Sequence, residues 1–383
     1  MGDTRRLLLL TTSLDRGGAQ RQVVDIAARL RGRGWAVVVV SMTPPRGYVD
    51  ELRQAGVPVA SLRMRPGRPT PLGWMRYGAV VRRWRPDVVH AHMIHANLLA
   101  RVGRPFAPRT PVVCTIHNVV EGARWRELAY RVTDPLATVT TAVSHAAAER
   151  YIRVGAVPRE RVVVVHNGFE VRSQPTPIEV TSVRRDLAPD TGFVWLSVGR
   201  LDHQKGYDIL IGAFPRLLEV VPDARLVIAG DGPERTALQD SIENLGLTGR
   251  VTLLGDRSDV VTLLAAADGF VLPSRWEGLP MVLLEAAAQR VPIVATDVGG
   301  SREVADPSTG AILTDVGADA IIGGMRRMMG LTAPERTLIG ERLRDHARTA
   351  FDMAAIVDRW EAIYAHALGR GSERASDAIA GRP

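Results

Sequence analysis

Short runs of β-branched and apolar residues alternate along the chain with longer amphipathic stretches, and this alternation restricts the possible folds more than any other feature. The first half contains the runs LLLLTT, WAVVVVSM, VPVASL, DVVHAH, PVVCTIH, ATVTTAV and RVVVVHNG. The second half continues with FVWLSVGR, ARLVIAGDG, RVTLLG, GFVLPS and VPIVATDVGG. Apolar strands separated by helices are typical of parallel sheets that are covered on both faces. We therefore expect an α/β protein with doubly wound sheets.

The alternation pauses once, at EVRSQPTPIEVTSVRRDLAPDTG, a stretch rich in proline and polar residues that is typical of a linker. A chain of 383 residues also exceeds what one hydrophobic core ordinarily serves. We therefore predict two Rossmann-like doubly wound domains that face each other across a cleft. The predicted parts are an N-terminal domain 1–172, a linker 173–191, a C-terminal domain 192–350, a helix 351–369 that returns towards the N-terminal domain, and a disordered tail 370–383.

Cysteine content and hydropathy indicate the compartment. Cys114 is the only cysteine, which excludes an intrachain disulfide framework. The apolar run Leu7–Leu10 is too short for a signal peptide, and no run approaches the roughly 18 apolar residues that a membrane span needs. We expect a cytoplasmic protein that is soluble or peripheral to the inner face of a membrane.

Positive charge is concentrated in the first half of the chain. Residues 1–170 contain 26 Arg, no Lys and 12 acidic residues, a balance of +14 within a net charge of +8 for the whole chain. One short stretch holds Arg53, Arg63, Arg65, Arg68, Arg76, Arg82, Arg83 and Arg85. A preference for Arg codons explains the scarcity of Lys but not the asymmetry, which an anionic membrane surface or a phosphorylated acceptor would explain. Aromatic residues make up only 5% and no nucleic-acid-binding module is visible, so we expect no nucleic-acid partner.

Two cations follow a predicted strand in the segment SVGRLDHQKGYDIL. The strand ends at Gly199 and Arg200, and a loop leads to Lys205, which is the only lysine of the chain. Ligands of open α/β sheets bind at the carboxyl ends of the strands. A guanidinium that can bind two oxygens and a compact ammonium together suit a diphosphate. The alternative is a pair of surface cations near a loop.

The same segment argues against other classes of nucleotide site. A P-loop needs Gly-Lys-Ser/Thr, but Lys205 stands between Gln204 and Gly206. The segment GDGPER carries Arg235 where a dinucleotide fingerprint has its third glycine, which disfavours a dehydrogenase. No two aspartates stand two positions apart, so a D-x-D metal site is absent and we expect no metal and no cofactor.

Two carboxylates flank an apolar run in SRWEGLPMVLLEAAA. Pro280 suits the first position of a helix, which puts the amides of Met281 and Val282 at a helix N-terminus that can stabilise an anion. Glu277 precedes this helix and Glu285 lies between one and two turns inside it. Because acids repel phosphates, we expect both to accept hydrogen bonds from neutral hydroxyls, one on a sugar and one on a ribose diol. The alternative is that both are ordinary helix charges, which the apolar neighbours of Glu285 disfavour.

Together these residues resemble the GT-B glycosyltransferases of the large retaining family 4 over nearly the whole chain. The pieces that carry the resemblance are GGAQR, VHAH, TIHN, HNGFE, SVGRLDHQKG, AGDGPER and EGLPMVLLE. The last piece matches the E-x7-E motif of the family and stands in order behind Arg200 and Lys205. The resemblance implies a retaining, metal-independent hexosyltransferase with an acceptor-side N-terminal domain and a C-terminal domain that binds a nucleotide-sugar donor.

The resemblance also implies roles for individual residues. Arg200 and Lys205 would hold the donor diphosphate and stabilise the leaving group. Glu285 would bind the ribose hydroxyls, Glu277 would contact the donor sugar, and His117 would face the sugar and the acceptor, although a lone histidine is often structural. The other donor-binding residues that it implies are Gly17, Gly18, Gly199, Leu279, Pro280, Met281 and Val282.

The acceptor is inferred from charge. The positive N-terminal domain would receive a glycan or a lipid-linked acceptor of polysaccharide biosynthesis, at a membrane whose anionic lipids attract it. A predicted helix carries Trp74, Met75, Tyr77 and Trp84 among arginines, a mixture that suits such a surface, whereas an ordinary helix would turn its aromatic residues to the core. Three other functions stay open: transfer to a soluble small molecule, nucleotide-sugar epimerisation, and regulation by binding without catalysis.

Overall fold

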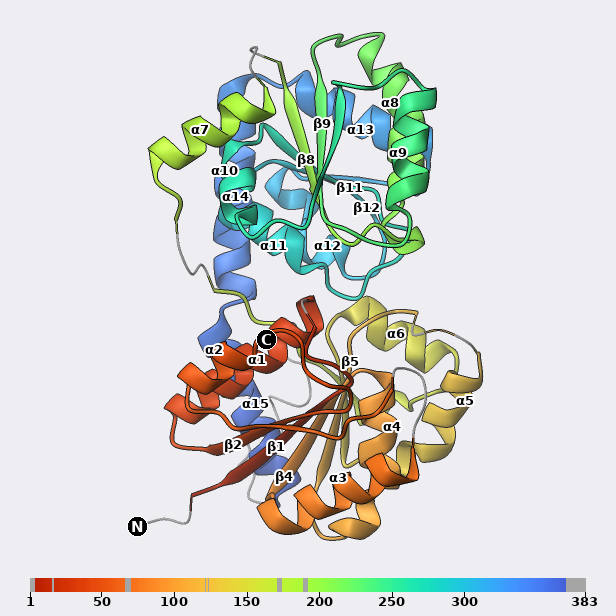
Figure 1. Cartoon of the computed structure of the whole chain (residues 1–383), viewed down its shortest axis with the longest axis vertical. Coiled ribbons are helices and arrows are strands. Elements are labelled where there is room, and N and C mark those ends of the chain that lie inside the picture. The colour runs from red at the N-terminus through yellow and green to blue at the C-terminus, as the bar shows by residue number, and fades with distance from the viewer. Residues whose placement is uncertain are drawn as a thin grey trace. The chain divides into compact units, whose positions relative to one another are not determined.

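The chain folds into two compact units that each contain one parallel sheet (Figure 1). The computed structural model describes residues 4–15, 17–65, 70–120, 122, 124–170, 174–188 and 192–369. Unit 1 comprises Met1–Gly168 and Met353–Pro383, and unit 2 comprises Phe169–Asp352. The tail expected to be disordered, 370–383, lies outside the described residues.

The sheet of unit 1 has the order β3-β2-β1-β4-β5-β6-β7, and its strands pair in parallel. The strands are β1 Arg6–Thr11, β2 Ala36–Ser41, β3 Val59–Ser61, β4 Val88–His92, β5 Val112–Ile116, β6 Val139–Ala142 and β7 Val162–Val164. Each lies in one of the apolar runs of the first half of the sequence. The alternation therefore predicted this sheet correctly.

Helices cover both faces of this sheet, because successive side chains of each strand point to opposite sides. Leu7 and Leu9 of β1 pack in one core with α1 (Gly18–Gly32) and α15 (Met353–Ala367). Leu8 and Leu10 pack in a second core with α3 (Pro71–Trp84) and α4 (Ile94–Val102). The other helices of unit 1 are α2 Val49–Gln54, α5 Arg124–Thr133 and α6 His145–Arg153, with 3₁₀ turns η1 Arg104–Phe106, η2 Asp134–Leu136 and η3 Arg159–Arg161.

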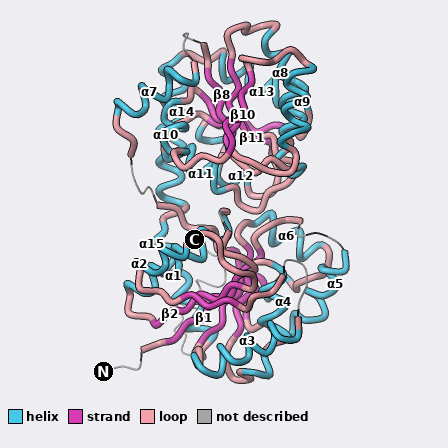
Figure 2. Tube along the Cα trace, in the orientation of Figure 1, coloured by secondary structure: helices cyan, strands magenta, loops and turns pink. Residues whose placement is uncertain are grey.

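Unit 2 repeats the architecture with a sheet of order β10-β9-β8-β11-β12-β13. Its strands, which Figure 2 colours magenta, are β8 Val194–Val198, β9 Arg225–Ala229, β10 Val251–Gly255, β11 Gly269–Leu272, β12 Ile293–Thr296 and β13 Ile312–Thr314. Its helices are α7 Pro177–Leu187, α8 Tyr207–Leu218, α9 Arg235–Asn244, α10 Val260–Ala266, α11 Met281–Ala288, α12 Ser301–Val304, α13 Ala318–Met329 and α14 Ala333–Ala350, with 3₁₀ turns η4 His203–Lys205 and η5 Pro307–Thr309.

The segment interpreted as a linker contains helix α7. Thr176 caps it: its side chain accepts from the amide of Glu179, while the Glu179 carboxylate accepts from the Thr176 amide in return. Pro177 occupies the first helical position, where a missing N–H costs nothing. The proline and polar residues that suggested a linker are therefore helix-start signals. Arg184 anchors α7 to unit 2 through an ion pair of 2.6 Å with Asp268.

The order of strands reverses once in each sheet, between β1 and β4 in unit 1 and between β8 and β11 in unit 2. At such a point the two adjacent loops leave the sheet in opposite directions and open a crevice at the carboxyl ends of the strands. Ligands of doubly wound sheets bind there. In this chain, the loops at these two points are those after β1, β4, β8 and β11.

Candidate active site

The loops after β8 and β11 in unit 2 are pressed against each other at the reversal point. Gly206 ends the first loop with φ of 69°, a left-handed conformation that favours glycine. A Cβ on Gly206 would lie only 2.2 Å from the carbonyl oxygen of Pro273, which begins the second loop. The amide of Arg275 also donates to the carbonyl of Gln204 at 2.7 Å. This close contact brings Lys205 next to the second loop.

Lys205 and Glu277 form a largely buried ion pair. The Lys205 Nζ lies 2.6 Å from Oε1 of Glu277, and Glu277 as a residue is only 5% exposed. The hydroxyl of Ser274 donates to the same Oε1 at 2.7 Å. Among the described residues, the other oxygen, Oε2, receives only a long contact of 3.4 Å from the Gln204 amide. The Glu277 carboxylate is thus held by one oxygen, and the second keeps the capacity to accept a hydrogen bond.

The backbone of Glu277 is held by the loop after β12. Gly299 has φ of 54°, and a Cβ there would lie 1.8 Å from the carbonyl oxygen of Glu277. The amide of Gly300 donates to the carbonyl of Gly278 at 2.9 Å. Sequence reasoning missed Ser274 and Gly299, although the pair of glycines directly after a predicted strand was a signal for a close backbone approach.

Helix α11 begins at Met281, directly after this loop. Pro280 has extended angles and caps the helix, so the helix starts one residue later than predicted. Leu279 is buried beside the cap, whereas Met281 and Val282 are half-buried in the first turn. The N-terminus of α11 therefore adds partial positive charge next to the Lys205–Glu277 pair.

Glu285 lies one turn further along α11, between buried residues. Burial raises the pKa of its carboxyl from 4.5 to about 7. A carboxyl with that pKa is close to half ionised at neutral pH. Hydroxyl groups that donate to it would favour the ionised form, so a ligand diol would lower this pKa.

Arg200 lies at the end of β8 but is not part of the buried cluster. Its side chain is 71% exposed and pairs loosely with Asp202, with Nε and Oδ2 3.6 Å apart. Gly199, beside it, lies against the Lys205 side chain, because a Cβ on Gly199 would be 3.2 Å from the Lys205 Cε. The two predicted cations therefore share a strand end, Lys205 in a largely buried pair with Glu277 and Arg200 mostly exposed to solvent.

Unit 1 carries the remaining predicted residues, near the ends of β1 and β5. Gly17 ends the loop after β1, and Gly18 is the first residue of α1. A Cβ on Gly17 would lie 2.6 Å from the Gln20 side-chain oxygen, and the Gln20 amide donates to Ser13 at 3.1 Å. The loop is thus packed by its own side chains, and a larger residue at Gly17 would displace Gln20.

His117 follows β5 and belongs to a group of three histidines. Its Nε2 lies 2.9 Å from Nδ1 of His92 at the end of β4. His90 lies two residues before His92 on the same face of the strand, with ring centroids 4.0 Å apart. Burial lowers the pKa of His117 to about 3 and those of His90 and His92 well below 6.5, so all three are neutral at physiological pH. The sequence prediction named His117 alone, although two histidines inside the apolar run DVVHAH indicated a buried polar network.

Comparisons with known proteins agree with this architecture. Residues 16–173 match the model of Glycosyltransferase Family 4, and residues 181–345 match that of Glycosyl transferases group 1. The lipopolysaccharide core biosynthesis mannosyltransferase LpsB of Rhizobium meliloti is 30% identical over 302 residues, which cover 74% of this chain and 80% of LpsB. The chain belongs to the group 1 glycosyltransferases of family 4.

Other relatives are matched over less of their length. The alignment with the glycosyltransferase MJ1059 of Methanocaldococcus jannaschii is 33% identical but spans 37% of that protein, and the alignment with the glycogen synthase of Mycobacterium tuberculosis is 30% identical and spans 62% of it. These alignments cover 39% and 68% of this chain. Similarity to these proteins is thus partial.

Among solved structures, that of Anabaena Alr3699/HepE in complex with UDP has a TM-score of 0.80 and 25% identity, with 93% of this chain and 98% of that chain covered. The lipopolysaccharide biosynthesis glycosyltransferase WaaG has a TM-score of 0.73 at 19% identity, covering 94% and 99%. The two doubly wound sheets of this chain are those of the GT-B fold.

Proposed function

We propose that the chain transfers a hexosyl group from a nucleoside-diphosphate sugar to an acceptor hydroxyl, with retention at the anomeric carbon and without a metal ion. The observation that carries the proposal is the buried pair of Lys205 and Glu277 at the reversal point of unit 2. The only lysine of the chain lies there, between two loops whose close contact depends on glycines. The UDP complex of the Anabaena neighbour supports a nucleotide at this kind of fold.

The pair suits a donor with a charged leaving group and a neutral sugar. Lys205 and Arg200 would stabilise the charge that builds on the diphosphate as its bond to the anomeric carbon breaks. Glu277 would accept a sugar hydroxyl through Oε2, because Oε1 is engaged by Lys205 and Ser274. Glu285 would accept the ribose hydroxyls. Gly17, Gly18, Gly199 and the first turn of α11 would leave room for the diphosphate.

The proposed step balances without an added base. The acceptor oxygen bonds to the anomeric carbon on the face that the diphosphate leaves, and the acceptor proton passes to a departing phosphate oxygen. Glu277 is poorly placed to abstract this proton, since its Oε1 is engaged by Lys205 and Ser274. Retention follows, because the new bond forms on the side where the old bond was.

Product analysis tests this proposal. A thermal-shift screen against nucleotide sugars first identifies the donor, since a ligand at a hundredfold excess over its Kd stabilises by about 2.7 kcal/mol. The donor is then incubated with acceptor glycans in EDTA, and the product is examined by NMR. Transfer with the donor's anomeric configuration is the expected result. An inverted product, a requirement for added metal, or an epimerised donor in the absence of acceptor would each contradict it.

For the acceptor we propose a lipid-linked glycan met at the cytoplasmic face of an anionic membrane. One relative, 28% identical over 58% of this chain, is the Escherichia coli UDP-Gal:alpha-D-GlcNAc-diphosphoundecaprenol alpha-1,3-galactosyltransferase. No helix in the described part of the chain is both long and apolar enough to cross a bilayer. Contact with lipid would therefore be peripheral, through the surface of unit 1.

Helix α5 supports such a contact. Trp125, Leu128 and Val132 are 57%, 61% and 69% exposed and recur at the spacing of one helix face. The one acid of α5, Glu127, is neutralised by Arg150 at 2.6 Å, and Arg131 is exposed beside the apolar face. An exposed apolar stripe beside an exposed arginine is typical of helices that lie on anionic membranes. We call Trp125, Leu128 and Val132 the α5 stripe.

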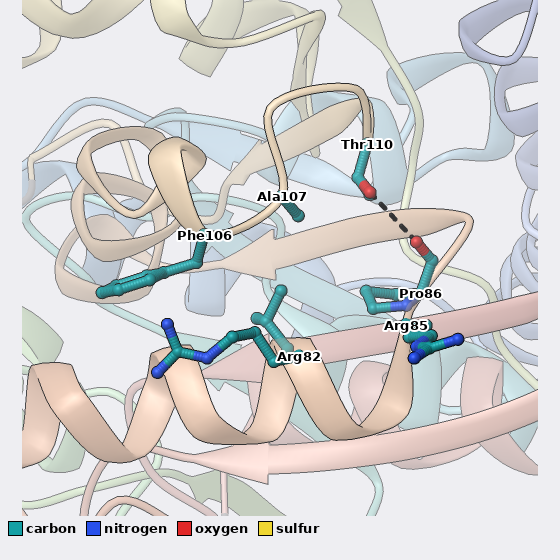
Figure 3. Close-up of a pocket in the computed structure, with 7 residues that line it drawn as sticks. Arg82, Arg85, Pro86, Phe106, Ala107 and Thr110 are labelled. Carbon is teal, nitrogen blue, oxygen red and sulfur yellow. Dashed lines mark hydrogen bonds between the residues drawn. The ribbon is translucent and has the colours of Figure 1, made fainter.

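Helix α3 carries a second mixture of apolar and cationic residues, but not the one predicted. Tyr77 is buried and Trp84 packs partly against the core, so these two aromatic residues serve folding. Leu72, Trp74 and Met75 are exposed. At the other end of α3, a hollow of about 430 Å³ is lined by Val81, Arg82, Arg85, Pro86, Phe106, Ala107 and Thr110 (Figure 3). Arg82 stacks over Phe106, and the two arginines lie at opposite ends of the hollow, where anionic head groups would be attracted.

A further inference from the structure

The contact between His92 and His117 can be made in two ways. Both rings are neutral, so each carries one proton on one of its two nitrogens. Either His92 Nδ1–H donates to Nε2 of His117, or His117 Nε2–H donates to Nδ1 of His92, across the same 2.9 Å. The first arrangement leaves His117 with its proton on Nδ1, and the second leaves that nitrogen bare. The two arrangements give His117 opposite hydrogen-bonding characters.

The burial of His92 distinguishes these arrangements. His92 is 1% exposed, and its Nε2 has no hydrogen-bond partner among the described residues. If His117 donated, the proton of His92 would sit on this Nε2 as a buried N–H without an acceptor. If His92 donates, the same atom is a bare nitrogen, an acceptor without a partner. This is the less costly arrangement, because buried N–H groups without partners are the rarest unsatisfied groups in proteins.

The ring of His92 is also held in place. It lies against His90, whose Nδ1 and Nε2 contact the Tyr364 and Thr115 hydroxyls at 2.7 Å each. Trp360 packs against His90 in turn, with the centroids of the two rings 4.5 Å apart. Both Trp360 and Tyr364 come from α15, so the C-terminal helix of unit 1 supports the ring that contacts His117.

We propose that His92 is a positioning residue, which donates from Nδ1 to Nε2 of His117 and so holds His117 as the Nδ1–H tautomer, a hydrogen-bond donor towards the substrate. The proposal rests on the proposed function for the role of His117 and deepens it. A neutral N–H suits an acceptor atom of the substrate, such as a hydroxyl or phosphate oxygen. His117 is then no general base, in agreement with transfer of the acceptor proton to the leaving phosphate.

Nitrogen NMR tests the tautomer without any substrate. In protein labelled with ¹⁵N-histidine, long-range proton–nitrogen spectra distinguish protonated from bare ring nitrogens, and spectra of His92→Asn and His117→Asn assign the two rings. Protonated Nδ1 on both rings is the expected result. A protonated Nε2 on His117 in the wild-type protein would overturn the proposal, and this spectrum decides even if the chain lacks transferase activity.

Substitutions of His92 give an independent kinetic test. The Asn side chain has an amide as many bonds from Cβ as Nδ1 of His, whereas the Gln amide corresponds to Nε2. His92→Asn should therefore keep kcat/KM within about threefold, while His92→Gln should lose roughly tenfold, the effect of one hydrogen bond. His366→Asn, an exposed change on α15, is the control. Equal losses for Asn and Gln would show that His92 acts through packing alone and would refute the positioning role.

Discussion

At the scale of single residues, the Lys205–Glu277 pair is the contact that sequence reasoning did not foresee. The sequence assigned the lysine to a diphosphate and the acid to a sugar, because motif spacing shows which residues approach a ligand. Spacing does not show which residues bind each other first, and that depends on the fit of the loops around Gly206 and Gly299. The pairing implies that Lys205 is already oriented before a donor binds.

Lys205→Ala should therefore affect both stability and turnover. It leaves Glu277 buried without a counter-ion, which costs about 3–5 kcal/mol of unfolding free energy, and kcat should fall roughly 10²–10³-fold. Arg200→Ala should lower kcat similarly but change stability by less than about 0.5 kcal/mol, because its side chain is exposed. Denaturant titration and steady-state kinetics measure the two effects.

A double variant separates them further. Lys205→Ala with Glu277→Gln should regain much of the stability without regaining turnover. The uncompensated charge of Glu277 is gone, but the ammonium group that would bind the diphosphate is still absent. Arg216→Ala, which breaks an exposed pair with Asp319, is the matched control and should alter neither quantity. Near-normal turnover in Lys205→Ala would refute the proposal that Lys205 stabilises the departing diphosphate.

Glu285 should make stability depend on pH. Its pKa is about 7 in the folded chain against 4.5 in the unfolded one, so the folded state holds the proton more tightly. Stability is then highest below pH 4.5 as far as this group is concerned, and declines as pH rises towards 7. Glu285→Gln should gain stability relative to the wild type over this interval, with a constant advantage above it. A pH series of denaturant titrations measures the difference, and a constant difference from pH 5 to 8 would contradict the raised pKa.

Glu285 and Glu277 should also differ in what they bind. Glu285→Ala should weaken the affinity for a bare nucleoside diphosphate, because the ribose contact is lost. Glu277→Ala should weaken the nucleotide sugar more than the bare nucleotide, which loses only the orientation that Glu277 gives to Lys205. Calorimetry with both ligands provides the comparison, and equal losses on the bare nucleotide would refute this division between the two acids.

At the scale of elements, local sequence signals predicted most strands correctly, but they missed one short strand and one helix. Runs such as DVVHAH predict buried strands because few other structures tolerate them. β13 was missed, since Ile312–Thr314 is too short to form a run. α7 was missed because Pro177 was interpreted as a breaker rather than as the first residue of a helix. α11 was predicted to within one residue, from the fixed φ of Pro280.

Two glycine substitutions test how the loop after β12 holds Glu277. Gly299 and Gly246 have similar φ values, 54° and 66°, but only Gly299 has a neighbour where a Cβ would lie. Gly246→Ala should cost about 1–2 kcal/mol of stability from backbone strain alone and leave turnover intact. Gly299→Ala should cost more and also lower turnover, because the new methyl group displaces the Glu277 carbonyl. Thermal unfolding and kinetics measure both, and equal behaviour of the two variants would show that Gly299 does not position Glu277.

At the scale of the whole molecule, the repeated alternation predicted two doubly wound sheets because a parallel sheet needs helices on both faces, and each half of the sequence has enough apolar runs for one. The surface was harder to predict. Tyr77 and Trp84 were expected beside lipid and serve the core instead, whereas the α5 stripe went unnoticed. Exposure depends on which face of a helix meets the sheet, and a run of Arg and aromatic residues does not determine it.

The α5 stripe should decide whether unit 1 binds membranes. The chain is expected to co-sediment with anionic but not with neutral vesicles, with an affinity that falls as salt rises, because each basic residue near the surface contributes about 1 kcal/mol. Trp125→Ser with Leu128→Ser should weaken binding by at least about tenfold, since each side chain contributes more than about 1 kcal/mol when it leaves water. The matched control is Ile178→Ser with Leu338→Ser, two exposed apolar residues of unit 2. Arg82→Glu with Arg85→Glu should reduce the salt-sensitive part of the affinity while sparing the apolar part. Equal binding by the α5 variant and its control would remove the stripe from the proposal, and full activity on a soluble acceptor without vesicle binding would favour a small-molecule substrate.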